Sequence, residues 1–145
     1  MNQLLFITAD RCGVRDKTSI VDIVRQARCS RQPVIDHFLE SGLFEERPFL
    51  YNLSQNLLRS WWEPEPSWHW DSRLAWLASR DLAMQRSFVP IGFANDNSGA
   101  IHLATYNSLD TVSAQEVANA YRAPVYLHCT TRSVVQEGQQ RVFGA

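Results

Sequence analysis

The stretch that decides the fold is FVPIGFANDNSGAIHLATYNSLDTVSAQEVANAYRAPVYLHCTTRSVVQEGQQRVFG, residues 88–144. Apolar runs at 88–93 and 100–105 are typical of short strands, and the sequence between them, ANDNSG, is dense in turn formers. This pattern predicts a β-hairpin, with Ile101 and Leu103 on one face of its second strand and His102 on the other.

The hairpin is followed by a helix, a third strand and a last helix. Thr111 or Ser113 can cap the first helix, residues 125–129 predict the strand, and Thr130 or Thr131 can cap the last helix. Because a helix that connects two strands of one sheet crosses right-handed, the second and third strands should be parallel. We therefore predict an α/β subdomain with a three-stranded sheet.

The chain before the hairpin predicts short amphipathic helices joined by tight turns. Thr18 and Ser19 can cap the first, and residues 34–39 predict a second that stops at Gly42. A third helix begins near Pro48, a residue that is comfortable in a first helical turn.

Residues 61–70, WWEPEPSWHW, interrupt this helical pattern with two prolines and four tryptophans. Prolines remove backbone donors and push the preceding residue to extended geometry, so this segment predicts a stiff linker. Its rings should pack between two subdomains or, alternatively, form a partner surface. We expect a helical subdomain at 1–60, the linker at 61–71 and the α/β subdomain at 72–145, which begins with a helix from Asp71 or Ser72 to Met84. The expected fold class is α+β.

Composition excludes several classes of function. The chain has 145 residues, 45% hydrophobic and 20% charged, which predicts a folded globular protein. Its net charge of −1 gives no reason to bind nucleic acid or an acidic membrane surface. No apolar run approaches the roughly 18 residues of a membrane span, and Asp10 and Arg11 interrupt the N-terminal apolar stretch. We expect a cytoplasmic protein without direct membrane insertion.

The residues that usually carry catalysis form no known motif. Walker A, GxGxxG, HExxH and GxSxG patterns are absent from the sequence, and no cofactor or metal site is predicted. Cys12, Cys29 and Cys129 form no CxxC pair, so neither a disulfide framework nor a zinc site is indicated. We expect no catalytic residues, although a small stand-alone enzyme or effector stays open. It would need Cys129 or Cys12 beside one of the four histidines, His37, His69, His102 and His128.

Residues 80–144 resemble the N-terminal domain of type II secretion and type IV pilus assembly ATPases. Residues 101–105, IHLAT, match the second strand of that domain, and Phe143-Gly144 matches its final aromatic-glycine pair. Asn107-Ser108 stands where the family usually has Asp-Pro.

The resemblance implies a non-catalytic adaptor or regulatory domain. It would dock the motor hexamer, whose ATP site lies on a following region, onto the cytoplasmic part of an inner-membrane platform protein. The chain would then lie in the cytoplasm, peripheral to the inner membrane through its partners, and we expect it to be a piece of a longer protein. Aromatic groups left exposed are the candidates for the contact: Trp61, Trp62, Trp68, Trp70 and Tyr106.

The first half carries a degenerate tandem repeat with an offset of 29 residues, which aligns Gly13-Val14 with Gly42-Leu43. In the cyclic di-GMP-binding version of the family, such repeats read RLGxxLxxxGLxxxxxLxxxLxxQ. Leu4 and Pro33 stand where that motif has arginine, which argues against tight binding of the dinucleotide. A cyclic di-GMP-binding domain of divergent motif is the alternative, with Arg11, Arg28 or Arg31 in place of the missing arginines.

Overall fold

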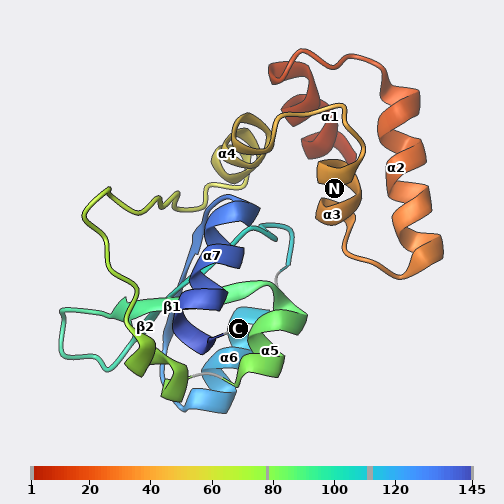
Figure 1. Cartoon of the computed structure of the whole chain (residues 1–145). Helices are drawn as coiled ribbons and strands as arrows, with labels where there is room; N and C mark the ends of the chain where they lie inside the picture. The colour runs from red at the N-terminus through yellow and green to blue at the C-terminus, as the bar shows by residue number, and fades with distance from the viewer. Residues whose placement is uncertain (1, 78, 111–112, 145) are drawn as a thin grey trace.

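The computed structural model describes residues 2–77, 79–110 and 113–144. Its N-terminal half is a group of four helices, which Figure 1 shows at one end of the molecule: α1 (Asn2–Arg11), α2 (Lys17–Ser30), α3 (Val34–Glu40) and α4 (Glu46–Asn56). Helix α1 packs against α2 and α4, and α2 packs against α3. None of the described helices is long and apolar enough to cross a membrane.

The four helices enclose a core of aliphatic and aromatic side chains. Leu5, Ile35, Phe38, Phe49 and Leu53 are fully buried in it. Phe49 stacks on both Phe38 and Phe44, with ring centroids 5.3 and 4.5 Å away. Such offset aromatic stacking adds to the free energy gained by burying the rings.

Two details of this half differ from the sequence prediction. Helix α1 was not predicted as a helix of its own, and Thr18 and Ser19 do not cap α2. The cap is Asp16, whose carboxylate accepts hydrogen bonds from the Thr18 backbone N–H at 3.0 Å and from Ser19 Oγ at 2.9 Å. Thr18 and Ser19 lie inside the first turn and donate to the cap.

The C-terminal half is built on a mixed sheet in the order β1-β2-β3. β1 (Phe88–Phe93) and β2 (Ile101–Thr105) pair antiparallel as the predicted hairpin, and β2 pairs in parallel with β3 (Val125–Cys129). A register shift between Pro90 and Gly92 marks a bulge. Pro90, which has no backbone N–H to donate, is tolerated because β1 lies at the edge of the sheet.

Helices cover both faces of this sheet. On one face, Ile101 and Leu103 pack with α5 (Arg80–Arg86) and α6 (Ser113–Tyr121). On the other face, Val89 and Ala104 pack with α7 (Arg132–Phe143) and the 3₁₀ helix η1 (Ser72–Leu77). The predicted α+β class, with N-terminal helices followed by an α/β region, is confirmed.

The ends of the C-terminal helices follow the prediction only in part. Thr131 caps α7, because its side chain accepts a hydrogen bond from the Val134 backbone N–H. Helix α6 begins at Ser113, whereas Thr111, the other predicted cap, and Val112 lie outside the described residues.

The single helix predicted from Asp71 or Ser72 to Met84 is wrong. The segment divides into η1 and α5, and Ser79 between them is extended, with φ −70° and ψ 135°. Ser79 Oγ accepts the Leu82 backbone N–H at 2.9 Å, so it starts a new helix instead of continuing the old one.

The linker joins the two halves through the edge of the sheet. The Cys129 backbone N–H donates to the Ser60 carbonyl at 2.7 Å, and the Trp62 N–H donates to the Cys129 carbonyl at 2.8 Å. Trp61 packs on the core of the N-terminal helices, and Trp62 packs on the core under η1 and α7. The two consecutive indoles therefore pack against two different cores. The boundaries 1–60, 61–71 and 72–145 stay a prediction.

Polar contacts also bind α7 to the N-terminal helices. Glu46 accepts hydrogen bonds from the Ser133 backbone N–H at 3.0 Å and from Ser133 Oγ at 2.7 Å. Asp36 lies 3.7 Å from Arg132 and accepts the Tyr106 hydroxyl at 2.9 Å. A carboxylate at a helix N-terminus is also favoured by the helix dipole.

Candidate functional site

Three tryptophans of the linker form a compact cluster over α7. Trp62, Trp68 and Trp70 meet edge to face, with ring centroids 5.2 to 6.1 Å apart. The indole of Trp70 lies directly on Gly138 of α7, where only a residue without a side chain leaves room for the ring. Pro64 and Pro66 prevent a helix here, and the chain turns at residues 66–67, where the Trp68 N–H donates to the Glu65 carbonyl at 2.8 Å.

Beside this cluster lies a hollow of about 740 Å³ with an aromatic lining. Trp68, Trp76 and Phe93, from the linker, η1 and the end of β1, are the large apolar groups that it exposes. Trp76 is 91% exposed, Phe93 57% and Trp68 37%. Aromatic rings left this open are typical of protein interfaces, and we call these three residues the aromatic surface.

The border of the aromatic surface is charged. A second hollow beside Trp68 is lined by Trp62, Glu63, Glu65, Ser67, Trp68 and His69. Glu63 lies 2.9 Å from Arg47, and Asp71 is held by Arg73 at 2.8 Å. The hydrogen bonds from Arg73 lower the pKa of the Asp71 carboxyl. Polar groups around apolar rings are the usual composition of an interface rim.

The structure places the five predicted docking residues very differently. Trp68 is exposed, Trp62 and Trp70 are half-buried in the cluster, and Trp61 packs edge to face on Tyr51 at 5.5 Å. Their role in binding stays a prediction.

Tyr106 differs most from the expectation of an exposed ring. It is 8% exposed, its hydroxyl donates to Asp36, and it accepts a hydrogen bond from Ser87. Burial raises the pKa of this phenol. Tyr106 therefore belongs to the core between the two halves and offers almost no surface to a partner.

Sequence reasoning missed Trp76 and Phe93 as surface residues. Trp76 falls within the single helix predicted from Asp71 or Ser72 to Met84, and Phe93 ends the predicted apolar strand. The position of Phe93 next to the turn was the available signal, since side chains at strand ends leave the sheet core.

The structure does not bring the three candidate arginines together. Arg11 ends α1 and donates to Asn56 Oδ1 at 2.8 Å. Arg28 and Arg31 lie at the C-terminal end of α2, whereas Arg11 precedes its N-terminal end. A rise of 1.5 Å per residue puts Arg28 about 16 Å from Lys17 along the helix axis.

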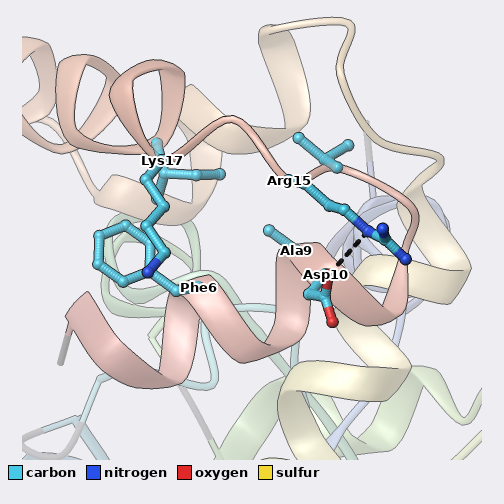
Figure 2. A pocket seen from close by; sticks show the side chains of 7 residues that line it. Phe6, Ala9, Asp10, Arg15 and Lys17 are labelled. Atoms are coloured by element: carbon cyan, nitrogen blue, oxygen red, sulfur yellow. Dashed lines mark ion pairs between the residues drawn. The ribbon is translucent and has the colours of Figure 1, made fainter.

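A different cationic pocket lies between α1 and the start of α2, and Figure 2 shows its lining. Arg15 Nε lies 3.2 Å from Asp10, and Lys17 Nζ lies 5.5 Å above the centre of the Phe6 ring. Cations beside an aromatic ring suit a phosphorylated planar ligand. The pocket measures about 190 Å³, below the roughly 300–1,000 Å³ of most small-molecule sites, so a dinucleotide would need it to open.

The alternative of a cysteine–histidine site is not supported by the neighbours Cys129 and His128 at the end of β3. Neighbouring residues of a strand point to opposite faces, so Cys129 and His128 face apart. Burial raises the pKa of the Cys129 thiol to about 11, which disfavours the nucleophilic thiolate. His128 instead bonds to Ser60 Oγ at 2.6 Å and to His102 at 2.7 Å.

The architecture defines the class of fold: a group of helices joined by an aromatic linker to a small α/β sheet. No family model matches the sequence and no curated protein matches it. Among solved structures, the chain is similar to one of MshE with cdg, at TM-score 0.68 and 15% identity over 97% of this chain and 96% of the other. It is also similar to the N-terminal domain of XpsE in two crystal forms, at TM-scores of 0.62 and 0.57. Identities there are 20% and 19%, over 83% and 91% of this chain and 83% and 88% of the others. The fold expected from the resemblance to N-terminal domains of secretion and pilus ATPases is confirmed.

Proposed function

We propose that the chain is a non-catalytic N-terminal domain of a type II secretion or type IV pilus assembly ATPase. It docks the motor hexamer, through a following region, onto the cytoplasmic part of an inner-membrane platform protein. It acts in the cytoplasm, peripheral to the inner membrane. The shared fold supports the kind of domain, and the aromatic surface carries the proposal of docking.

The chemistry of the aromatic surface fits a protein partner. Trp76 and Phe93 expose most of their rings beside Trp68, whose own ring is fixed by its edge contacts with Trp62 and Trp70. A ring held in place by packing loses little conformational freedom when it is covered, so more of its burial contributes to affinity. Truncation of such an aromatic anchor typically costs about 2 kcal/mol or more of binding free energy.

The test is binding of the purified chain to the cytoplasmic segment of the platform protein from its own system, measured by calorimetry. We expect Trp76→Ala and Phe93→Ala each to weaken binding at least about tenfold, or 1.4 kcal/mol. The matched control is Ile7→Ala. The Ile7 side chain is 42% exposed but lies on α1, outside the aromatic surface. Wild-type affinity in both aromatic variants would contradict docking through this surface.

Cyclic di-GMP binding is a second candidate function. It is favoured by the cationic pocket of Figure 2 and by the structure of MshE with cdg, in which we take cdg to be that dinucleotide. Arg15 and Lys17 would then take the role first assigned to Arg11, Arg28 and Arg31. Calorimetric titration with cyclic di-GMP, with ATP and GTP as controls, should give heat that Lys17→Ala abolishes and Arg25→Ala leaves unchanged. No heat with the wild-type chain would remove this candidate.

A further inference from the structure

Two histidines from adjacent strands converge on one face of the sheet. His102 on β2 and His128 on β3 lie diagonally opposite, because His102 pairs with Tyr126 and His128 pairs with Ala104. Nδ1 of His102 lies 2.7 Å from Nε2 of His128, and the ring centroids are 4.9 Å apart. Both side chains are half-buried, on the part of this face next to the linker residue Ser60.

The contacts of the pair leave one proton between the two rings. Ser60 Oγ lies 2.6 Å from Nδ1 of His128, so that nitrogen either donates to the hydroxyl or accepts from it. When Nδ1 of His128 carries the proton, its Nε2 is an acceptor that faces Nδ1 of His102. If the proton of His102 then lies on Nε2, two unprotonated nitrogens face each other.

We propose that His102 and His128 form a two-ligand site for a divalent transition-metal cation of the Zn²⁺ class. The ion takes the place of the shared proton between Nδ1 of His102 and Nε2 of His128, and that proton moves to Nε2 of His102, so that both rings stay neutral. Imidazole nitrogens suit Zn²⁺, Ni²⁺ and Cu²⁺, and these ions bind neutral histidine.

The site needs only a small rearrangement to accept the ion. Two nitrogens about 2.0–2.1 Å from a tetrahedral zinc lie about 3.3 Å apart, so the rings must separate by roughly 0.6 Å. Rotation of imidazole about its last side-chain torsion has a broad energy minimum, which makes this separation inexpensive. In the part of the chain that the structure describes, no group of three histidine, cysteine or carboxylate ligands is present. Water therefore completes the coordination.

Ser60 supports the metal-bound arrangement. A histidine that binds a metal through one nitrogen usually donates the proton on its other nitrogen to an acceptor, and Ser60 Oγ, 2.6 Å from Nδ1 of His128, is in position to be that acceptor. Ser60 also begins the segment that pairs with β3, because its carbonyl accepts the Cys129 N–H. A bound ion would therefore hold the start of the linker to the sheet.

The experiment is a titration of the tag-free chain with ZnCl₂, followed by calorimetry and by NMR of the imidazole nitrogens. We expect one saturable site with a dissociation constant below about 1 mM. The changes in NMR chemical shift should be confined to Nδ1 of His102 and Nε2 of His128, and EDTA should reverse them. His102→Ala and His128→Ala should abolish the site. Ser60→Ala should weaken it about tenfold, the usual effect of removing an outer hydrogen-bond partner.

The matched control is His37→Ala. His37 also bonds to a serine, Ser30 Oγ at 2.9 Å, but no second histidine faces it. The His37→Ala variant should leave zinc binding unchanged. His128→Gln keeps a polar group beside Ser60 and provides a second test if an alanine variant fails to fold, as judged by circular dichroism. The proposal is overturned if the wild-type chain binds no zinc, or if the folded His102 and His128 variants bind it as the wild type does.

Discussion

The contact between Trp70 and Gly138 makes a sharp prediction about the packing of the linker on α7. A Cβ added at Gly138 would lie 2.6 Å from Cη2 and 2.7 Å from Cζ3 of Trp70, well inside van der Waals contact. The ring cannot simply turn aside, because Trp62 and Trp68 pack against it at 5.9 and 6.1 Å. Gly138→Ala should therefore overpack this site.

The size of the effect follows from two opposing terms. Alanine in place of glycine in a helix interior stabilises by about 1 kcal/mol, whereas overpacking costs about 1–3 kcal/mol. Gly138→Ala should thus change the free energy of unfolding of the wild-type chain by about 0 to −2 kcal/mol. With Trp70→Ala already present the overlap is gone, and the same substitution should stabilise by about 1 kcal/mol.

The assay is urea denaturation of the four chains of this double-mutant cycle, followed by far-ultraviolet circular dichroism. We expect a coupling free energy of about 1–3 kcal/mol between the two positions. The control is Gln136→Ala, at an exposed position of the same helix. It should change the free energy of unfolding by the same amount with Trp70 present and with Trp70→Ala. Equal effects of Gly138→Ala with and without Trp70 would refute the packing of the linker on α7.

Three further predictions test other parts of the molecule. Cys29 is exposed whereas Cys129 is buried with its pKa raised to about 11, so at pH 8 only about one Cys129 in a thousand is thiolate. Alkylation followed by peptide mass spectrometry should modify Cys29 long before Cys129, and comparable rates would contradict the burial. The hydrogen bonds from Ser19 and Thr18 lower the pKa of Asp16, so their stabilisation is present above the unfolded pKa and is lost as the pH falls through the folded one. Urea midpoints measured from about pH 5 to pH 2 should fall less steeply in Asp16→Asn, and an identical slope would exclude this cap. Phe49→Ala should cost about 3–5 kcal/mol of unfolding free energy by the same assay, and a loss below 1 kcal/mol would mean that the ring is not in the core.

The local sequence pattern was sufficient to predict the sheet but not the helix that precedes it. The hairpin was predicted correctly because turn residues separate its two apolar runs. The parallel third strand was predicted correctly because a helix that connects two strands of a sheet forms a right-handed crossover. The helix through Met84 was wrong because its apolar spacing continued past Ser79, whereas the Ser79 side chain caps a new helix. Spacing alone cannot distinguish one continuous helix from two separate helices.

The candidate site was harder to predict than the fold because the solvent exposure of a side chain depends on the tertiary structure. Trp76 and Tyr106 illustrate this in opposite directions. Trp76 was given no surface role within the predicted helix and is 91% exposed, whereas Tyr106 was predicted to be an exposed docking residue and is buried. Tyr106 is covered by α3 through its bond to Asp36, a residue 70 positions away. The pairing of His102 with His128 likewise depended on the strand register, which the sequence does not specify.

The arrangement of Trp61 and Trp62 also has a mechanical consequence. Their side chains pack against two different cores, and the backbone on either side of Trp61 is hydrogen-bonded to Cys129, through the Ser60 carbonyl and the Trp62 N–H. A pulling force that separated the N-terminal helices from the sheet would therefore have to extract an indole and break these two bonds almost together. The two halves should consequently resist load as one unit, and rupture under tension should occur in one step at this junction.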